Sequence, residues 1–487
     1  MSIVALSTAI QGLNVAQRQL ETISLNVSNA STPGYTRKSL LQSTTVLNGQ
    51  GSGVSVGQLQ RSIDESLRND MWRQTSQATF SEVAESYLSR VQQMFGTPDS
   101  QQSFFAAMSS VKDSFVSLAA DPSNAVLQSQ VISRAQTLAS RFNTMSQNIQ
   151  SLRNNVEAQI QDHTSQMNTL LTNIADLNLA IVAANNRGDA AVDLMDQRDQ
   201  YIQELSEFMN ISTYNSSNGA IVVQTPNGSI LADTTARTFS FDLTPMSYNT
   251  YYPATANGIE LNGVDVTSQI STGKIGQLFK LRDETLPQAQ AMIDEAAHKL
   301  ALRLQAQDII LFTDASGNVP TDVVANYVGF SANIRVNEDI INDPSLLKDG
   351  TSGSSLNASD NTKILNVIDY AFGDYQDSSS TAHASFRTSG LGPGGNLSIS
   401  LPSSGNILGY SKNLITNQAQ VYSEARSAKE FEVSYRDTLS KRYLDESGVS
   451  IDNEMTLMIT VQKAYAASAR TITTVSEMFD ELLGALR

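Results

Sequence analysis

Both ends of this 487-residue chain carry apolar side chains at heptad spacing, in steps of alternately four and three residues. Such a stripe is narrower than the face that a globular helix usually buries, and it is typical of a coiled-coil seam. We predict that each end forms a long helix and that these helices pair, with each other or with those of neighbouring subunits. The predicted seam comprises Ile3, Leu6, Ile10, Leu13, Gln17, Leu20, Ser24 and Val27 near the N-terminus, and Ile451, Met455, Met458, Gln462, Tyr465, Ala469, Ile472, Ser476, Phe479, Leu483 and Leu486 near the C-terminus.

Composition narrows the possible classes of function. Cysteine is absent, so neither a disulfide framework nor thiol chemistry is available. The formal net charge is -16, from 32 Lys and Arg against 48 Asp and Glu. A chain this acidic repels phosphate backbones, so we expect no nucleic-acid partner.

Targeting signals are not evident in the sequence. The first residues, MSIVALSTAIQGL, have no basic segment and no small-residue cleavage site of the kind that a secretory signal peptide carries. No run of 18 apolar residues occurs, which predicts no membrane span. If the chain leaves the cell, we expect it to leave uncleaved.

The most specific motif follows the first predicted helix, where residues 26–37 read NVSNASTPGYTR. Two asparagines three residues apart share a helix face, and asparagine is tolerated where a helix ends. Pro-Gly predicts a turn with a positive φ at the glycine. A helix stop with a turn is one interpretation, and an assembly motif is the other. The motif positions are Asn26, Asn29, Thr32, Pro33, Gly34 and Tyr35.

The C-terminal stripe lies in a stretch without Gly or Pro from Asn453 to Leu483. A helix of about 31 residues is therefore predicted, roughly 46 Å long. Asp452 is predicted to cap it, and Glu454 suits its first turn. Because isolated helices are marginal in water, we expect both ends to become ordered only when neighbouring subunits supply a partner surface.

Between the ends, helical and strand-like stretches alternate. The longest, Ser123 to Arg187, contains no Gly or Pro, and its apolar stripe slips by one residue between Val156 and Ile160. One long helix, or two with a bend, would give this pattern. Further helical periods are predicted at 62–94, 277–307 and 409–445, and strand or hairpin patterns at 54–59, 220–233, 238–243 and 258–266.

We predict an α+β, multidomain fold, in which a long helical bundle or rod with paired terminal coiled-coil helices carries β-rich inserted domains. The expected division is terminal coiled-coil segments at 1–40 and 450–487, a helical core domain at 41–210, 273–310 and 406–449, a β-rich segment at 211–272, and a mixed, inserted outer domain at 311–405.

Residues that could carry catalysis or bind a metal are few. The histidines His163, His298 and His383 lie far apart and lack a metal-ligand spacing. The loop GLGPGGN at 390–396 lacks the Lys and Ser or Thr of a phosphate loop and is predicted to lie on the surface. We predict no catalytic, cofactor or metal site, and no enzyme activity.

Three aspartates are spaced three residues apart and could share one helix face: Asp193, Asp196 and Asp199. Arg187 and Arg198 are close in sequence. The pattern favours an ion-pair network over a cation site.

The motif at 26–37 resembles the N-terminal signature of bacterial flagellar axial proteins, in which an Asn-x-x-Asn pair leads into Thr-Pro-Gly-Tyr, and all six positions match. Residues 448–487 resemble the C-terminal signature of the same family. The order of TPGYTRK, QRSID, YLSRVQQMFGTPDS, LASRFNTM and DLMDQRDQYIQELSEF is similar to that of the hook-associated members. The resemblance covers about 1–310 and 410–487 and is weak in 311–405.

This resemblance implies a structural subunit that joins the flagellar hook to the filament and assembles through its terminal helices. It implies location in the extracellular flagellum without a cleaved signal peptide. The implied partners are further copies in a ring or helical layer, the hook protein, a second junction protein, the flagellar export apparatus and an export chaperone. The alternative is a flagellum-associated enzyme that acts on peptidoglycan through a site in 311–405.

Overall fold

The structure, a computed structural model, describes residues 2–47, 50–97, 100–353 and 355–485. Contacts divide the chain into two units, each discontinuous in sequence. We call Met1–Ala78, Gln166–Thr238 and Glu432–Arg487 the terminal unit, and Thr79–Ser165 with Phe239–Phe431 the central unit. The helices α2 (Glu65–Phe95), α4 (Ala125–Arg187) and α13 (Ile407–Ser447) contribute residues to both.

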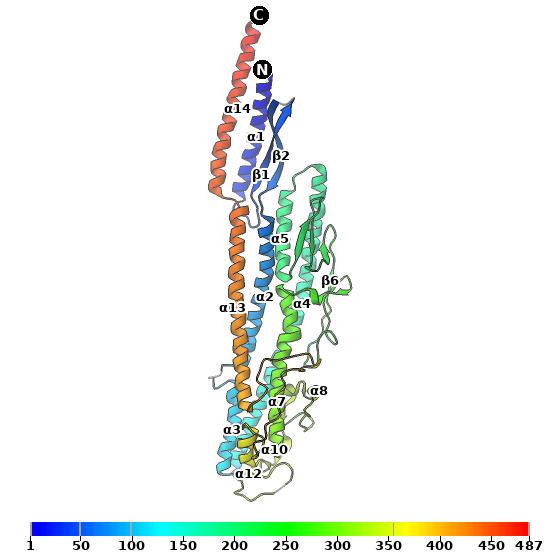
Figure 1. The fold of residues 1–487 in the computed structure, drawn as a ribbon, viewed down its shortest axis with the longest axis vertical. Helices are drawn as coiled ribbons and strands as arrows, with labels where there is room; N and C mark the ends of the chain where they lie inside the picture. Colours follow the sequence, from blue (N-terminus) through cyan, green and yellow to red (C-terminus); the bar gives the residue numbers. More distant parts are fainter. Residues whose placement is uncertain (1, 48–49, 98–99, 354, 486–487) are drawn as a thin grey trace. The chain divides into compact units, whose positions relative to one another are not determined.

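The terminal unit contains both ends of the chain (Figure 1). Its further helices are α1 (Ser2–Ser28), α5 (Val192–Phe208) and α14 (Ile451–Ala485), and its strands are β1 (Lys38–Leu47), β2 (Gln50–Arg61), β3 (Ser212–Asn215), β4 (Ile221–Gln224) and β5 (Ile230–Ala232). β1 and β2 form an antiparallel hairpin, and β3, β4 and β5 form a small antiparallel sheet.

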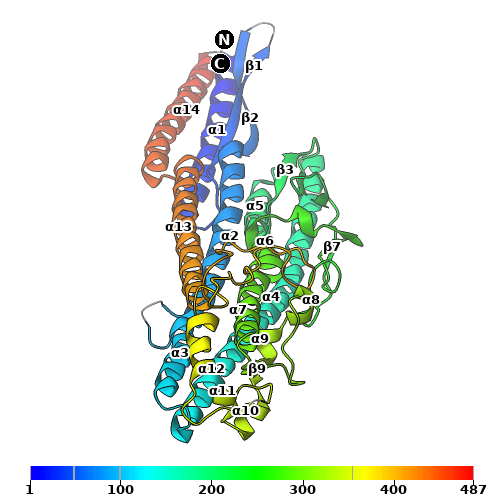
Figure 2. The same ribbon diagram turned by 60° about the horizontal axis from the view of Figure 1, so that its bottom comes forward.

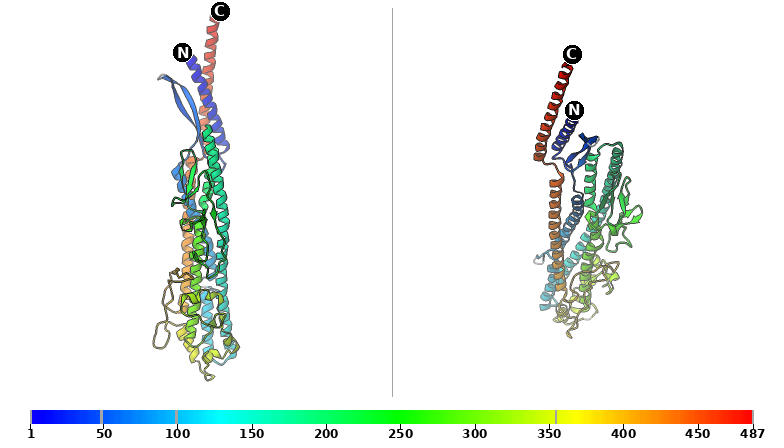
Figure 3. Two further views of the ribbon diagram at one scale, coloured as in Figure 1. Left: turned by 90° about the vertical axis from the view of Figure 1, so that its right-hand side faces the viewer. Right: turned by 45° about the horizontal axis from the view of Figure 1, so that its top comes forward.

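The helices α1 and α14 lie side by side, as two further views also show (Figure 3). Their shared core consists of Ala16, Ile23 and Val461, with Leu20, Val27 and Met458 packed against it. They approach closely at Gly12, where an added Cβ would lie 3.1 Å from Ser468 Oγ. Each end thus supplies an apolar partner surface to the other within one chain. Ordering of the ends by neighbouring subunits stays a prediction.

Some predicted seam positions are partly buried, and at others the buried side chain lies one residue earlier. Partly buried, as expected for a seam, are Leu6, Leu13, Leu20 and Val27 on α1 and Met458, Ala469, Ile472 and Phe479 on α14. Between them the buried positions are Ala9, Ala16 and Ile23 on α1 and Val461 and Val475 on α14, whereas Ile10, Gln17, Ser24, Gln462 and Ser476 are exposed.

The predicted seam positions and the positions buried in the structure both repeat every seven residues, so periodicity alone does not distinguish them. Because the helices approach closely, small side chains such as Ala9 and Ala16 occupy the buried positions, and Ile10 remains 44% exposed. Tyr465 and Leu483 are 39% and 64% exposed, and Leu486 lies outside the described residues. A role for these residues between subunits stays a prediction.

The α14 helix begins one residue earlier than its predicted cap. Asp452 lies in the first turn, and the Asn453 N–H reaches Ser450 Oγ at 3.4 Å. The predicted strand at 54–59 is the middle of β2, and its partner β1 was missed. The sequence of β1, KSLLQSTTVL, does not alternate strictly, and its ladder with β2 shifts register twice. Pairing with β2 stabilises a strand that its own pattern does not predict.

The other hairpin predictions are confirmed. Gly228, at φ +88°, turns the chain between β4 and β5. Asn262 and Gly263, both with positive φ, connect β7 (Glu260–Leu261) to β8 (Val264–Asp265). This pair of positive φ values is the one that a tight hairpin of matching twist requires.

The central unit is built around α4 and α7 (Leu286–Gln305), which Figure 2 shows alongside one another with short helices nearby. Its remaining elements are α3 (Phe104–Ala120), β6 (Phe239–Ser240), β7, β8, the 3-10 helix Thr267–Gln269, α6 (Gly273–Lys280), the π-helix η2 (Leu281–Thr285), β9 (Phe312–Thr313), α8 (Val324–Tyr327), α9 (Phe330–Asn333), β10 (Arg335–Val336), α10 (Glu338–Asn342), α11 (Leu346–Asp349), α12 (Thr362–Asn366) and the π-helix η3 (Val367–Ala371). The predicted fold class, with long helices and small dispersed sheets, is confirmed.

The 63-residue α4 is one continuous helix across the slip in its stripe. The buried Arg153 and Glu157 lie at this point. Arg153 donates hydrogen bonds to the carbonyl oxygens of Ser247 and Thr250, both at 2.7 Å, and Glu157 pairs with Arg282 at 3.0 Å. The apolar stripe is interrupted because the charged side chains of α4 bind a loop, at Ser247 and Thr250, and the π-helix η2, at Arg282.

One 18-residue window of α4 is apolar enough to cross a membrane by length and composition, and 44% of that window is buried inside the protein. The core helix of a soluble protein passes the same test. The absence of a membrane span stays a prediction.

The close α1–α14 contact leads to a stability prediction. Ala16→Leu should force the helices apart and lower the free energy of unfolding by about 1–3 kcal/mol, because the site has no room for three more carbons. The matched control Ile10→Leu changes an exposed neighbour and should be neutral. Urea unfolding, with tryptic cleavage at Arg18 and Lys463, measures both. Equal stability of the two variants would contradict the packing described here.

Candidate functional site

Asn26 is the buried centre of the Asn-x-x-Asn motif, at the C-terminal end of α1 and only 1% exposed. Its side-chain amide Nδ2 donates to the Lys38 carbonyl oxygen at 2.9 Å, and its Oδ1 accepts from the Lys38 N–H at 3.0 Å. Oδ1 also accepts from the Tyr35 hydroxyl at 3.0 Å, and Nδ2 reaches Glu454 Oε2 at 3.2 Å. One amide therefore links the end of α1, the start of β1 and the start of α14.

The Thr-Pro-Gly-Tyr part of the motif forms the predicted turn. The Tyr35 N–H donates to the Thr32 carbonyl oxygen at 3.2 Å, and Gly34 has φ +74°, which with Pro33 before it gives a type II turn. The side chain of Gln200, on α5, donates to the Pro33 carbonyl oxygen. Asn29 stabilises the preceding loop by accepting from Thr32 Oγ1 at 3.2 Å.

Tyr35 lies half-buried beside acidic groups. The Lys38 ammonium sits 3.9 Å from the centre of its ring. Burial, with the negative charges of Asp193, Asp196 and Glu454, raises the pKa of Tyr35 to about 12. The hydroxyl therefore stays protonated and continues to donate to Asn26 at any physiological pH.

Glu454 connects the two ends of the chain electrostatically. It is completely buried in the first turn of α14, and its carboxylate pairs with Arg37 Nε at 2.6 Å. The Arg37 N–H also donates to the carbonyl oxygen of Ser447, at the end of α13. Glu454, an acidic residue that suits a helix N-terminus, thus also holds the segment at Arg37 that follows the motif.

The aspartates of α5 form ion pairs with basic residues of the β1–β2 hairpin and of α2. Asp196 pairs with Arg61 at 3.1 Å and with Lys38 at 3.4 Å, and it accepts from Thr36 Oγ1 at 2.6 Å. Asp199 pairs with Arg61 at 2.9 Å and with Arg68 at 2.8 Å. Lys38 also pairs with Asp193. The predicted ion-pair network is confirmed.

The partners of this network differ from those expected nearby in sequence. Arg198 does contact Asp199, at 3.4 Å, but Arg187 pairs with the exposed Asp189, at 3.0 Å, outside the network. Burial alone would raise the pKa of Asp199, yet the charges of Arg61, Arg68 and Arg198 together lower it below its ordinary value. We call the residues Asn26, Tyr35, Arg37, Lys38, Arg61, Arg68, Asp193, Asp196, Arg198, Asp199 and Glu454 the joint.

The joint contains more residues than sequence reasoning identified. Of the motif, Asn26 and Tyr35 enter it directly, while Asn29, Thr32, Pro33 and Gly34 shape the loop that delivers Tyr35. Arg37, Lys38, Arg61 and Arg68 were missed as a group. Of the four, Arg37 and Lys38 directly follow the motif positions, whereas Arg61 and Arg68 lie further along the chain. The acidic partners of all four are more than 100 positions away.

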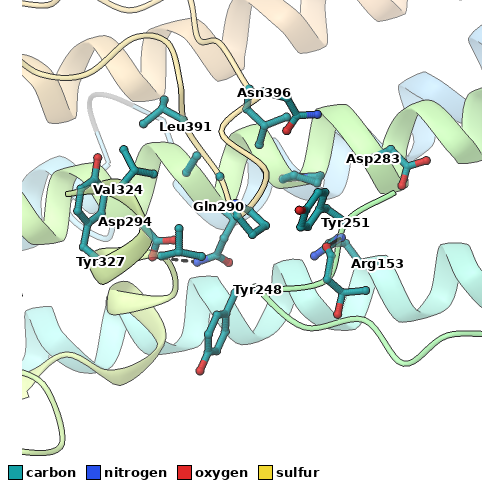
Figure 4. Close-up of a pocket in the computed structure, with 17 residues that line it drawn as sticks. Arg153, Tyr248, Tyr251, Asp283, Gln290, Asp294, Val324, Tyr327, Leu391 and Asn396 are labelled. Carbon is teal, nitrogen blue, oxygen red and sulfur yellow. Dashed lines mark hydrogen bonds between the residues drawn. The ribbon is translucent and has the colours of Figure 1, made fainter. Parts of the chain in front are cut away.

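A small cavity in the central unit is the second place with candidate chemistry (Figure 4). Figure 4 shows Gln290 and Asp294 reaching toward each other from α7, with Tyr327 at one end and Tyr251 and Arg153 toward the other. Only about 20 Å³ is open to the centres of water molecules, which is room for about one water. The GLGPGGN loop closes it with its buried Leu391, and its tip is exposed as predicted.

The polar groups of this cavity form hydrogen bonds with one another and with the adjacent segment at Gly329 and Ser331. Asp294 accepts from Ser331 Oγ at 2.6 Å and from the Gly329 N–H at 2.9 Å. Burial raises the pKa of Asp294 to about 6, although these hydrogen bonds favour its ionised form. Burial likewise lowers the pKa of Arg153 to about 10. The cavity is organised as a supporting network of the fold, with little room for a substrate.

Candidate metal ligands remain dispersed. His298 is buried and stacked on Tyr327, with ring centres 4.1 Å apart, and His383 Nε2 lies 2.7 Å from the Tyr370 carbonyl oxygen. Within the described ranges, no cluster of three or more His, Cys, Asp or Glu side chains is arranged to hold a metal ion.

Comparisons with known proteins match the same parts of the chain. Residues 88–309 match the family model of the flagellar hook-associated protein FlgK helical domain. Residues 6–36 match that of the flagella basal body rod protein, and residues 440–485 that of the flagellar basal body rod FlgEFG protein C-terminal.

Among curated relatives, flagellar hook-associated protein 1 of Salmonella typhimurium is 29% identical over 335 residues, which cover 64% of this chain and 58% of that protein. The chain thus spans less than two thirds of that relative. The Bacillus subtilis protein of the same name is 22% identical over 514 aligned residues, covering 99% and 98%. A solved structure of the flagellar hook junction protein FlgK from Burkholderia pseudomallei has a TM-score of 0.42 and 23% identity, over 52% of this chain and 45% of that one.

The joint leads to a prediction about Asp199. Asp199→Asn should lower the free energy of unfolding by about 3–5 kcal/mol at pH 7, because it leaves buried arginines without their counter-charge. The exposed control Asp189→Asn should cost no more than about 0.5 kcal/mol. Since the folded-state pKa of Asp199 is lowered, its stabilisation is present above the ordinary carboxyl pKa and is lost as pH falls through the folded-state value. Urea unfolding across pH 2–7 should show this loss in the parent and in Asp189→Asn, but not in Asp199→Asn.

The turn leads to a prediction that separates strain from contact. Gly34→Ala and Gly228→Ala both place a Cβ at positive φ, at roughly 1–2 kcal/mol each. Only at Gly34 would the new atom overlap a neighbour, the Gln200 side chain at 1.9 Å; nothing lies within 4 Å at Gly228. Gly34→Ala should therefore lose more stability in thermal melts, and Gln200→Ala should recover the difference. Equal losses at the two glycines would show that the Gln200 side chain moves aside without measurable cost.

Proposed function

We propose that this chain, which belongs to the family of flagellar hook-associated protein 1, is a structural subunit of the bacterial flagellum that joins the hook to the filament. Its terminal helices would pack with those of neighbouring copies into an inner layer, and the remainder of the chain would adapt the lattice of the hook to that of the filament. Support comes from both ends, because the rod-type signatures coincide with the helices that the joint holds together.

The observation that carries this proposal is the surface of α1. A helix exposed to water normally presents charged side chains on its outer face. α1 has 27 residues and only two charges, Arg18 and Glu21. Apart from these two charges, its exposed positions are Ser, Thr, Asn, Gln and Ala together with Val4, Ile10 and Leu25, which are 61%, 44% and 52% exposed. Neighbouring subunits can cover such a surface without the cost of removing ions from water.

The outer face of α14 supports the same conclusion. Ile451, Ile459, Met478 and Leu483 are between 51% and 64% exposed. The packed seam is used within the chain, so these outward residues are the ones left to bind other copies. Exposed apolar side chains gathered on one element mark an interaction surface.

The further partners follow as parts of the proposal. A subunit at this junction would contact the hook protein on one side and the second junction protein on the other. It would reach the extracellular flagellum through the flagellar export apparatus, uncleaved, with an export chaperone covering the apolar face of α14. Residues 311–405 would belong to an inserted domain on the outside of the layer.

Activity on peptidoglycan is the competing function, and no comparison supports it. We propose that the protein has no catalytic role. A zymogram on cell-wall substrate should remain uncleared by the purified chain, and a cleared band that depends on residues 311–405 would favour the enzyme.

The assembly face leads to a prediction for cells. Leu483→Asp should leave the α1–α14 contact intact, because Leu483 is 64% exposed, but should place a charge in the layer between subunits. Swimming should fall at least tenfold, and electron microscopy should show hooks without filaments. Val126→Asp, at an apolar position of the central unit that is 76% exposed, is the control and should swim normally. Normal filaments on Leu483→Asp cells would remove α14 from the proposed interface.

A further inference from the structure

A groove lies between α1 and the β1–β2 hairpin in the terminal unit, with about 850 Å³ of space open to water molecules. Its hairpin wall is apolar, formed by Leu40, Val54, Val56 and Leu59. Its other wall is a mostly polar face of α1 with Leu25. That face carries two charges of opposite sign, Arg18 and Glu21.

This groove lies on the side of α1 away from α14. The residues of α1 that line it include positions 11, 14, 18, 21 and 25. The positions that pack toward α14 are 9, 13, 16, 20 and 23, about half a helical turn away at 100° per residue. The chain's own α14 is therefore on the opposite face of α1 and cannot fill the groove.

A row of exposed apolar side chains on α14 is a suitable occupant. Ile451, Met455 and Ile459 are 51%, 43% and 52% exposed and follow at intervals of four, so they form one ridge. The ridge spans about 12 Å along the helix, and the hairpin wall from Val54 to Leu59 spans about 16 Å. Thr456 and Thr460, beside the ridge, donate to carbonyl oxygens of their own helix and so bring no unpaired hydroxyl into an apolar contact.

We propose that the groove between α1 and the β1–β2 hairpin binds the Ile451–Met455–Ile459 ridge of a second copy of this chain. The interface would continue the α1–α14 pair, with α1 packed between its own α14 and that of the neighbour. This inference rests on the proposed function and specifies which surfaces of two copies meet.

The placement of the two surfaces determines the kind of assembly. Groove and ridge are different patches of one subunit, so their contact is heterologous and leaves a free groove at one end and a free ridge at the other. Such contacts propagate into rings or helical layers instead of closing as dimers. The inference therefore predicts directional growth from a single repeated contact.

The absence of cysteine from the sequence gives a direct test. Cells would express two single-cysteine copies together, one with Met455→Cys and one with Asn14→Cys, Gln17→Cys or Glu21→Cys in the groove. Each chain then has one thiol, so every disulfide is between copies. Oxidised flagella should contain the ridge–groove disulfide for at least one groove position.

Leu457→Cys is the matched control for the ridge, because Leu457 is 36% exposed and lies on the other flank of α14. It should give at least fivefold less disulfide with the same groove position. Equal disulfide yields from Met455→Cys and Leu457→Cys would overturn the heterologous contact. So would disulfides that form mainly between two copies that both carry Met455→Cys. If the parent chain is present in flagella but no ridge–groove disulfide forms, the docking is wrong and the proposed function stands. If the parent chain is absent from flagella, the proposed function fails.

Substitution gives an independent arm. Met455→Asp with Ile459→Asp, and separately Val56→Asp, should each reduce incorporation into flagella at least tenfold, whereas Leu457→Asp should reduce it less than threefold. Thermal melts of the purified chains establish that each variant is folded. Folded ridge and groove variants that incorporate like the parent would overturn the proposal.

Discussion

The fold of the terminal unit depends on one group of buried charges that no single segment can neutralise. Asp196 and Asp199 come from α5, Lys38 and Arg61 from the hairpin, Arg68 from α2 and Glu454 from α14. Burying any one of these ions alone would cost several kcal/mol, and burying them together with good geometry removes most of that cost. The arrangement is therefore nearly all-or-none. It brings the two ends of the chain together at the joint.

Asn26 makes the joint specific because a side-chain amide both donates and accepts. It pairs with the N–H and the carbonyl of Lys38, as a neighbouring strand would, and its remaining donor reaches Glu454. An aspartate could not donate to the Lys38 carbonyl, and a leucine could do neither. The Pro33-Gly34 turn serves this geometry, since it returns the chain so that Tyr35 and Lys38 face Asn26.

Small residues in the α1–α14 contact leave larger apolar residues outside. Ala9, Ala16, Gly12 and Ser468 allow the helices to approach closely, so Ile10, Met455 and Ile459 remain exposed. A chain that buried its largest side chains within itself would have little left to bind another copy. The proposed assembly surface is thus a consequence of how the internal seam is packed.

The sequence by itself determined where the long helices lie, because apolar periodicity sustained over 27 to 63 residues is a strong helical signal. Whether the longest stretch forms one helix or two with a bend was decided by the tertiary structure, which shows one helix. It also determined the Pro33-Gly34 turn and the hairpins at Gly228 and Asn262-Gly263, because their dihedral angles are local properties. Tertiary structure alone decided which face of each terminal helix is packed, since two registers of one heptad pattern differ only in how closely the helices approach. It also decided the partners of Asp196, Asp199 and Glu454, because a charge carries no information about which distant segment will neutralise it.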